Sequence, residues 1–346
     1  MSKEFFTVSR DDEMYEAWPD LVLTDKGKMI CVFTECAHHI DRAESRVMIT
    51  ESLDLGKTWS KKRPLTEKTS RGNHFNNAKI SKLRDGRIAI ICDRAVEDDG
   101  SESSACIYLW IGDSEGENFG EPRIYPFSAI VPDKLRQLKT GRLIISAANA
   151  NTETGKLEQY LWYSDDGGDT WSDRVTLAAD PRYNLCEVCI LEREDGVLVA
   201  LLRENSFEGY DIMKAISYDG GKTWDGVYRT PMVAGHRPTG GFLRDGRVLV
   251  TYRFVPAYTE VAGSVSLGLH NIFATLLRGD ELTRKERQGT YFRTMPLFYD
   301  KHEKPDTGYT GWVELDGGDI YIVYYIKDDA DKAQIRGCRF NLSDIV

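Results

Sequence analysis

Apolar and polar residues alternate along the chain in short stretches that come in pairs. Each pair is joined by a turn that contains glycine, as in residues 79–92, where KISKLRDGRIAIIC places Asp-Gly between two such stretches. Alternation with a period of two is typical of a half-buried β-strand, and glycine readily adopts the positive φ of a tight turn. Each pair therefore predicts a β-hairpin.

The hairpin pattern occurs six times, and 50 to 72 residues separate successive turn glycines, which leaves room for two more strands in each repeat. Helical periodicity is not sustained; residues 280–290 accommodate a turn or two at most. Six repeats of four antiparallel strands predict an all-β, six-bladed β-propeller that forms one domain over residues 1–346. The turn glycines are Gly27, Gly86, Gly141, Gly196, Gly246 and Gly318.

A second repeat, S-x-D-x-G-x-T-W, stands between the hairpins at residues 52–59, 164–171 and 217–224. Its Asp side chain can accept backbone N–H bonds across a turn, and its Gly supplies an unusual φ. We expect each copy to be a structural turn that closes an outer hairpin, with the Trp packed beneath it. A calcium- or sugar-binding role for the repeat is the less favoured alternative.

Equivalent positions of the six hairpins indicate where a site would form. The first strand of each propeller blade lines a central channel, so residues at equal distances from the turn glycines are expected to face one place. Nine residues before the glycines stand Trp18, Asn77, Pro132, Glu187, Arg237 and Tyr309. Seven residues after them stand, among others, Asp93, Arg203 and Arg253.

Composition narrows the possible partners. A net charge of −10 and a pI near 5.3 disfavour nucleic acid, which an acidic protein repels. No apolar run approaches the roughly 20 residues that span a bilayer, and the first residues lack a secretion signal, so we expect a cytoplasmic protein without a membrane partner. The seven cysteines are expected to be free, mostly buried thiols. The oligomeric state stays open.

The S-x-D-x-G-x-T-W repeats are Asp-boxes, and through them the chain resembles the sialidase superfamily over essentially its whole length. The resemblance implies a six-bladed propeller, a tyrosine nucleophile activated by a glutamate, three arginines on the substrate carboxylate, an aspartate acid/base and no cofactor. Tyr309 in GYTGWVELDGG resembles the nucleophile and Glu187 in CEVCILEREDG its partner. Arg203 and Arg237 resemble the second and third arginines.

These residue types suit the chemistry that the resemblance implies. An anomeric carbon that bears a carboxylate repels an anionic nucleophile, whereas a phenol deprotonated during attack avoids that repulsion. Arginines bind carboxylates through charge-assisted, often bidentate bonds.

Two segments depart from the family pattern. Where sialidases carry the first arginine, this chain has Ala17-Trp18-Pro19, and Trp18 is expected either to stack on a sugar or to fill its blade. Where they carry the aspartate acid/base, residues 38–54 offer three candidates. Glu44 is nearest by spacing, and Asp41 and His39 are close enough to substitute.

Histidines add a further possibility, because His39, His74 and His236 lie in segments that lead into or out of first strands. At least one is a candidate for acid/base work. No H-x-H or H-E-x-x-H spacing accompanies them, so no metal is expected.

Three functional hypotheses follow from the sequence. The first is an exo-acting glycoside hydrolase that removes a terminal acidic, sialic-acid-like sugar from a small-molecule or oligosaccharide substrate. The second is hydrolysis or β-elimination of a uronic-acid glycoside with a histidine as acid/base. The third is a propeller that binds carbohydrate without catalysis.

Overall fold

The computed structural model describes residues 3–40, 42, 44–70, 72–96, 104–256, 259–261, 264–266 and 270–344. Over these residues the chain consists of β-strands, connecting turns and short 3₁₀ helices at Gly279–Thr283, Asp316–Gly318 and Leu342–Asp344. Within this described part, none of the helices is long and apolar enough to span a membrane.

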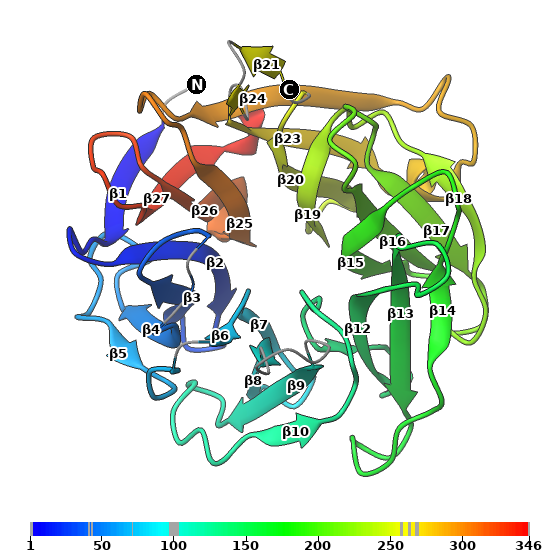
Figure 1. The fold of residues 1–346 in the computed structure, drawn as a ribbon, viewed down its shortest axis with the longest axis horizontal. Coiled ribbons are helices and arrows are strands. Elements are labelled where there is room, and N and C mark those ends of the chain that lie inside the picture. Colours follow the sequence, from blue (N-terminus) through cyan, green and yellow to red (C-terminus); the bar gives the residue numbers. More distant parts are fainter. Residues whose placement is uncertain are drawn as a thin grey trace. The chain divides into compact units, whose positions relative to one another are not determined.

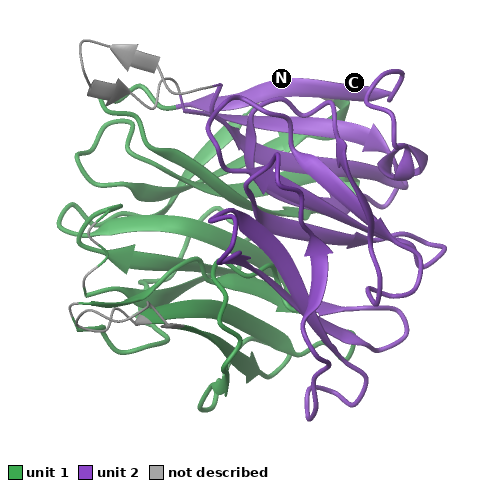
Figure 2. Ribbon diagram, turned by 45° about the vertical axis from the view of Figure 1, so that its right-hand side comes forward, with its two compact units in different colours: residues 1–135, 300–346 green, residues 136–299 purple. Residues whose placement is uncertain are grey.

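Nearly all the described strands belong to six antiparallel sheets, five with four strands and one with five, and two further strands form a small hairpin of their own (Figure 1). The predicted fold class, an all-β six-bladed propeller, is confirmed. The sheets divide between two compact units, which we call unit 1 (residues 1–135 and 300–346) and unit 2 (residues 136–299); Figure 2 colours them separately. The prediction of one domain over the whole chain stays a prediction.

Unit 1 contains three sheets. The first has the order β2 (Tyr15–Leu23), β3 (Met29–Cys36), β4 (Arg46–Ser52) and β5 (Arg63–Pro64). In the second, β6 (Asn73–Phe75) and β7 (Lys79–Lys82) both pair with β8 (Ile88–Val96), and β9 (Ser104–Gly112) and β10 (Arg123–Tyr125) follow. The third has the order β25 (Thr307–Glu314), β26 (Asp319–Ile326), β27 (Gln334–Asn341) and β1 (Glu4–Ser9).

Unit 2 contains the other three sheets. The first runs through β11 (Arg136–Gln137), β12 (Leu143–Ala150), β13 (Leu157–Ser164) and β14 (Val175–Ala178), and the second through β15 (Leu185–Glu192), β16 (Leu198–Glu204), β17 (Met213–Ser217) and β18 (Asp225–Arg229). The third comprises β19 (Gly235–Phe242), β20 (Arg247–Phe254), β23 (Asn271–Arg278) and β24 (Phe292–Tyr299). A separate two-stranded hairpin joins β21 (Thr259–Val261) to β22 (Ser264–Ser266).

The third sheet of unit 1 combines segments from both ends of the sequence. Its outer strand β1 pairs antiparallel with β27, with Glu4 opposite Arg339 and Thr7 opposite Arg336. The sequence predicts the β25–β26 hairpin but not this partner. The pairing ties the amino-terminal strand to a sheet and so protects an edge.

Apolar side chains of neighbouring sheets pack together inside each unit. In unit 1 one such core joins the third sheet to the first through residues such as Met29, Phe33 and Tyr321, and another joins the first to the second. Unit 2 has two equivalent cores, around Leu198 and around Val250. Burial of one such side chain contributes about 1.5–3 kcal/mol, so the cores hold the sheets that carry any site.

The Asp-boxes are structural turns, as predicted. In the first box, Ser52 Oγ accepts from the Gly56 N–H at 2.9 Å, and Asp54 accepts from both the N–H and the hydroxyl of Thr58 at 2.9 and 2.6 Å. The bonds from Thr58 lower the pKa of Asp54 to about 2. The indole N–H of Trp59 donates to the Gly56 carbonyl at 3.1 Å, which fixes the ring beneath the turn. The other two boxes repeat the bonds of the Ser and Asp side chains.

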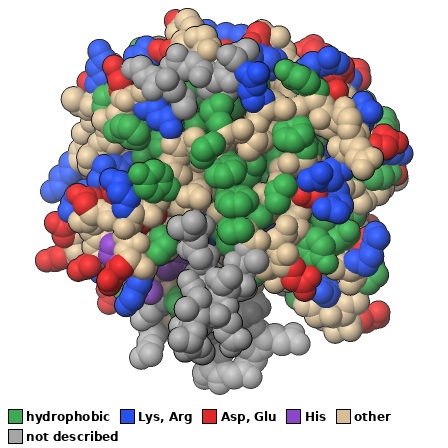
Figure 3. All heavy atoms as spheres, turned by 90° about the horizontal axis from the view of Figure 1, so that it is seen from above, with side chains coloured by type: hydrophobic (Ala, Val, Ile, Leu, Met, Phe, Trp, Pro, Cys, Tyr) green, Lys and Arg blue, Asp and Glu red, His purple; other side chains and the backbone are tan. Residues whose placement is uncertain are grey.

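The six predicted hairpin turns are present, and their glycines have φ between 82° and 93°. Charged side chains at the turn tips form local ion pairs such as Arg87 with Asp85 and Arg247 with Asp245. Figure 3 shows acidic and basic side chains interspersed over one face of the surface. These exposed pairs contribute little to stability, as expected for solvated turn tips.

Candidate functional site

Four of the six residues that stand nine positions before the turn glycines share one backbone irregularity. Trp18, Glu187, Arg237 and Tyr309 have φ of 57°, 48°, 49° and 31°, and each lies where the first strand of its sheet shifts register against the second. This is a β-bulge, in which an extra residue redirects a side chain. Left-handed backbone at a residue other than glycine costs about 1–3 kcal/mol and is frequent at functional sites.

The remaining two positions deviate in related ways. Asn77 lies where the first strand is interrupted between β6 and β7, and it is buried. Pro132 follows Val131, whose φ is 49°. The equal spacing in the sequence therefore corresponds to a repeated local structure.

In unit 2 the bulges of β15 and β19 belong to a buried group that we call the arginine cluster: Glu187, Arg203, His236, Arg237 and Arg253. Arg203 Nη1 lies 2.9 Å from Glu187 Oε2, and both side chains are almost fully buried. Arg253 stands opposite His236 in the β19–β20 register, and its Nη2 lies 3.3 Å from His236 Nδ1. The cluster thus combines three buried guanidinium groups with one carboxylate.

Phe207 connects the two halves of this cluster. The guanidinium of Arg203 lies 5.1 Å from the centre of its ring, and the His236 imidazole meets the same ring edge to face at 5.1 Å. Phe207 itself has φ of 62°. An aromatic face beside a guanidinium fixes the orientation of the guanidinium, which makes it a better hydrogen-bond donor to an anion.

Titration behaviour reflects the concentration of positive charge in the arginine cluster. Burial, reinforced by the charges of Arg203 and Arg253, holds the pKa of His236 well below its usual value, so its imidazole is neutral at pH 7. Burial raises the pKa of the neighbouring Cys186 thiol to about 12, although Arg203 and Arg237 both oppose that shift. Arg237 follows His236 on β19, which packs beside β15 and β16, so the predicted Glu187, Arg203 and Arg237 come from neighbouring strands of unit 2.

In unit 1 the bulges of β2 and β25 belong to a second group, which we call the tyrosine cluster: Tyr15, Trp18, His39, Asp306, Tyr309 and Tyr325. Asp306 is its centre, because its carboxylate accepts from the hydroxyls of Tyr15 and Tyr325 and lies 2.7 Å from His39 Nδ1. Burial and the Asp306 charge raise the pKa of Tyr15 well above its usual value.

Aromatic contacts extend this network to both bulged residues of unit 1. Tyr309 meets Tyr325 edge to face at 6.2 Å between ring centres. Trp18 meets His39 edge to face at 5.3 Å. His39 is about one third exposed, whereas Trp18 and Tyr309 are buried.

Arg42 connects the tyrosine cluster to Asp93. Its guanidinium lies over the Trp18 ring at 4.6 Å from the centre, and its Nη1 donates to the side-chain oxygen of Asn76. Asn76 in turn donates to Asp93 through its amide. Burial raises the pKa of Asp93, and the bond from Asn76 opposes this shift. A guanidinium thus stands beside the tryptophan of the Ala17-Trp18-Pro19 segment, the segment in which sialidases carry their first arginine.

Neither cluster, as defined above, includes the predicted candidates Glu44, His74 and Asp41. Glu44 is exposed, with a carboxylate oxygen 3.5 Å from Lys68 Nζ. His74 is half-buried on β6 opposite Ala95. Asp41 lies outside the described residues.

Three carboxylates of unit 1 approach one another as metal ligands do, but a lysine stands among them. Asp11, Glu16 and Glu35 lie within 4.8 Å of one another, and Lys62 Nζ lies 2.8, 2.7 and 2.6 Å from their respective oxygens. Burial opposes the charged form of Lys62, but the three carboxylates together raise its pKa. The Lys62 ammonium therefore takes the position between the three carboxylates that a metal ion would occupy.

The seven cysteines are free, as predicted. The C-x-x-C pair spans the bulge of β15, and Cys189 Sγ accepts from the Gly240 N–H at 3.2 Å and from Arg136 Nη2 at 3.3 Å. These bonds give Cys189 a structural role between β15 and β19.

Sequence reasoning missed Asp306, Tyr15 and Arg42. Asp306 stands three residues before Tyr309, so a search for acidic residues beside the proposed nucleophile finds it. Tyr15 likewise stands three residues before Trp18. This equal spacing from a bulged residue is the signal in the sequence that relates Tyr15 to Asp306.

Solved structures share this fold at low sequence identity. A protein of unknown function from Dyadobacter fermentans DSM 18053 is 20% identical with a TM-score of 0.80, and the match covers 97% of each chain. The Hadza microbial sialidase Hz136 is 17% identical with a TM-score of 0.73, over 99% of this chain and 69% of the sialidase. The intramolecular trans-sialidase from Ruminococcus gnavus, solved with oseltamivir carboxylate, is 14% identical with a TM-score of 0.68, over 96% and 95%.

Sequence comparison identifies the family to which the chain belongs. No curated protein matches the chain. The BNR repeat-like domain matches residues 73–322, which contain the second and third Asp-boxes. The chain therefore belongs to the BNR repeat-like domain family and has a sialidase-like fold.

Proposed function

We propose that this protein is a glycoside hydrolase that removes a terminal acidic sugar from a glycan. The observation that carries the proposal is the arginine cluster of unit 2, in which Glu187 holds Arg203 at 2.9 Å while Arg237 and Arg253 add two more buried guanidinium groups. Buried arginines oriented by a carboxylate and an aromatic ring are well suited to bind a sugar carboxylate through charge-assisted bonds. In this role they select an anionic sugar over a neutral one.

Tyr309 is the proposed nucleophile. It lies at a bulge of β25 that is equivalent to the bulges at Glu187 and Arg237. Its ring contacts Tyr325, whose hydroxyl donates to Asp306 at 3.1 Å. A phenol becomes a useful nucleophile when a base takes its proton during attack. We propose Glu187 of unit 2 as that base for Tyr309 of unit 1.

His39 is the proposed general acid, ahead of Glu44, and Asp41 stays a candidate from the sequence. Its Nδ1 faces Asp306 at 2.7 Å, which fixes the ring and leaves Nε2 to exchange a proton with a glycosidic oxygen. This arrangement of a carboxylate that orients an imidazole is the one that general acid/base catalysis uses elsewhere. Glu44, by comparison, lies exposed beside Lys68.

The test is a screen of fluorogenic sialosides, glucuronides and galacturonides with the wild type and with Tyr309→Phe. Loss of the nucleophilic hydroxyl is expected to lower kcat/KM on the order of 10³-fold or more while the melting temperature changes little. Tyr218→Phe, at an exposed tyrosine of an Asp-box, is the matched control and keeps full activity. Equal rates for wild type and Tyr309→Phe on the accepted substrate refute the assignment.

A second candidate reaction is β-elimination on a uronic-acid glycoside. It is favoured by one feature, the His39–Asp306 pair next to Trp18, where the family's first arginine is absent. A lyase forms an unsaturated product that absorbs in the near ultraviolet, whereas a hydrolase does not. β-Elimination removes the C5 proton of a uronic acid and breaks its C4–O bond, and a fluorogenic uronide has no glycosidic leaving group on C4. Absorbance of reactions with 4-linked oligouronides, run beside the screen, therefore separates the two reactions.

A further inference from the structure

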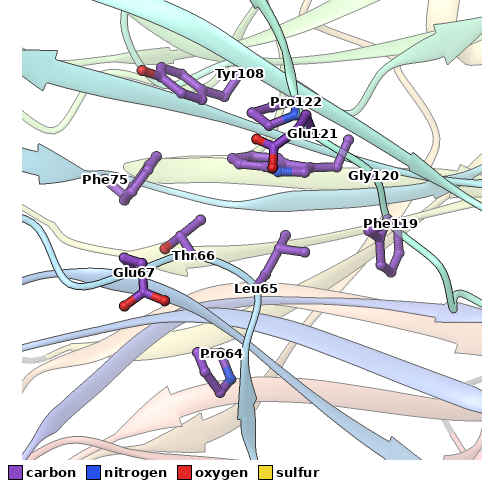
Figure 4. A pocket seen from close by; sticks show the side chains of 11 residues that line it. Pro64, Leu65, Thr66, Glu67, Phe75, Tyr108, Phe119, Gly120, Glu121 and Pro122 are labelled. Atoms are coloured by element: carbon purple, nitrogen blue, oxygen red, sulfur yellow. The ribbon is translucent and has the colours of Figure 1, made fainter.

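Unit 1 contains a cavity of about 460 Å³ that shares no residue with the arginine cluster or the tyrosine cluster (Figure 4). Its walls come from β5 and the residues that follow it, from β6 and β9, and from the segment between β9 and β10. This volume is in the range of pockets that hold small-molecule ligands.

Four aromatic residues line the cavity, and two of them, Tyr108 and Phe119, keep exposed ring surface. Phe75 meets Tyr108 edge to face at 5.6 Å, Tyr108 stacks on Trp110 at 5.7 Å, and Phe119 adds a partly exposed ring. Phe75 and Trp110 are about 5% exposed, so surrounding contacts hold them in place before any ligand arrives. Figure 4 shows Leu65 and Thr66 across from Phe75 and Tyr108. The apolar surface left accessible to a ligand is that of Phe119, Leu65 and the exposed part of Tyr108, and the C–H face of a sugar ring can pack against it.

Hydrogen-bond donors and hydrogen-bond acceptors both stand around these aromatic rings. Glu67 and Glu121 are exposed carboxylates that accept hydrogen bonds. The Tyr108 hydroxyl accepts from Arg94 at 3.2 Å and the Thr66 hydroxyl from the Val47 N–H at 3.0 Å, so each has its own hydrogen to donate. Vicinal sugar hydroxyls, which donate and accept at once, fit this combination.

Charge selects a neutral ligand. Two carboxylates stand among the described lining residues and no lysine or arginine does, which disfavours an acidic sugar. The two carboxylates attract a cationic ligand, but the guanidinium of Arg94 already lies over Phe75 at 5.6 Å and over Tyr108 at 5.9 Å, so neither ring offers an open face for a cation–π contact.

We infer that this cavity is a binding site for an uncharged sugar ring. The inference goes beyond the proposed hydrolase function, because it concerns other residues and a ligand of different charge. It needs no catalytic activity and stands or falls on binding alone.

The experiment measures binding by ligand-observed NMR and calorimetry on the full chain. The probes are methyl glycosides of glucose, galactose, xylose and N-acetylglucosamine, with methyl glucuronide and choline as charged comparisons. At least one neutral glycoside is expected to bind with a Kd on the order of 1 mM, as a ligand of this size allows. Tyr108→Phe and Glu121→Ala are each expected to weaken binding at least fivefold.

The controls separate this site from the proposed active site and from general damage. Glu303→Ala removes another exposed glutamate of unit 1 and is expected to leave binding unchanged, as is Tyr309→Phe. Thermal melts of the two cavity variants establish that they are folded. The inference is overturned if no neutral glycoside binds, if choline or the glucuronide is preferred, or if binding survives both cavity variants or is lost in Tyr309→Phe.

Discussion

The arginine cluster of unit 2 and the tyrosine cluster of unit 1 are built on the same bulge and carry different chemistry. In unit 2 the bulged residues are Glu187 and Arg237, and the contact around Glu187 is ionic, with Arg203 2.9 Å from its carboxylate. In unit 1 they are Trp18 and Tyr309, and the contacts are aromatic, with a single carboxylate, Asp306, that accepts from its neighbours.

This difference shows what a repeated fold keeps and what it leaves free. The backbone irregularity recurs because the spacing to the hairpin turn recurs, and its cost of about 1–3 kcal/mol applies whatever side chain is present. The side chain at the bulge can therefore vary from sheet to sheet. We expect the two clusters to respond differently to the same kinds of substitution.

The largest expected difference concerns the ion pair of unit 2. Arg203→Met leaves the buried Glu187 carboxylate without its arginine and is expected to lower the free energy of unfolding by about 3–5 kcal/mol. The double variant Glu187→Met with Arg203→Met removes both charges and is expected to recover most of that loss. Urea denaturation of the four proteins of the cycle measures the coupling. If the two single effects simply add in the double variant, the pair is not coupled as the geometry requires.

A smaller effect is expected from the neutral histidine of unit 2. Because the pKa of His236 is lowered in the folded protein, the unfolded chain binds a proton near pH 6.5 that the folded chain does not. Stability is therefore lost as the pH falls below about 6.5, with a slope of up to about 1.4 kcal/mol per pH unit from this one group.

His236→Gln is expected to remove this contribution. The carboxylates of the protein add their own acid dependence, so the informative quantity is the difference between wild type and variant in unfolding free energy from pH 7.5 to pH 5. As the pH falls, the unfolding free energy of His236→Gln is expected to decrease less than that of the wild type. Parallel curves for the two proteins argue against a neutral, buried imidazole at this position.

Much of the fold follows from local patterns in the sequence. Alternation around six glycines gives the hairpins, the Asp-boxes give three outer turns, and equal spacing picks out four bulged residues before any of them is seen. Patterns of this kind are local, since each is contained within about fifteen residues. Each needs only the period of a strand or the φ of a turn to be recognised.

The contacts that the sequence did not predict join distant segments. Strand β1 pairs with β27 across more than 300 residues, and Asp306 meets Tyr15 and His39 from the opposite end of the chain. An isolated aspartate in a loop carries no periodicity, and neither does Arg42 beside Trp18. Such contacts depend on which sheets pack together, and a single sequence contains little information about that packing.

The smallest expected effect tests the carboxylate of unit 1. Tyr325→Phe removes one of the hydroxyls that donate to Asp306, at 3.1 Å, while the bond from Tyr15 and the contact with His39 stay. Because Asp306 keeps these partners, the loss of unfolding free energy is expected to be about 1 kcal/mol, well below that of Arg203→Met. Urea denaturation under the same conditions gives the comparison directly. A loss as large as that of Arg203→Met implies that the phenol carries most of the stabilisation of the buried charge, and the contrast between a shared carboxylate in unit 1 and a single ion pair in unit 2 then fails.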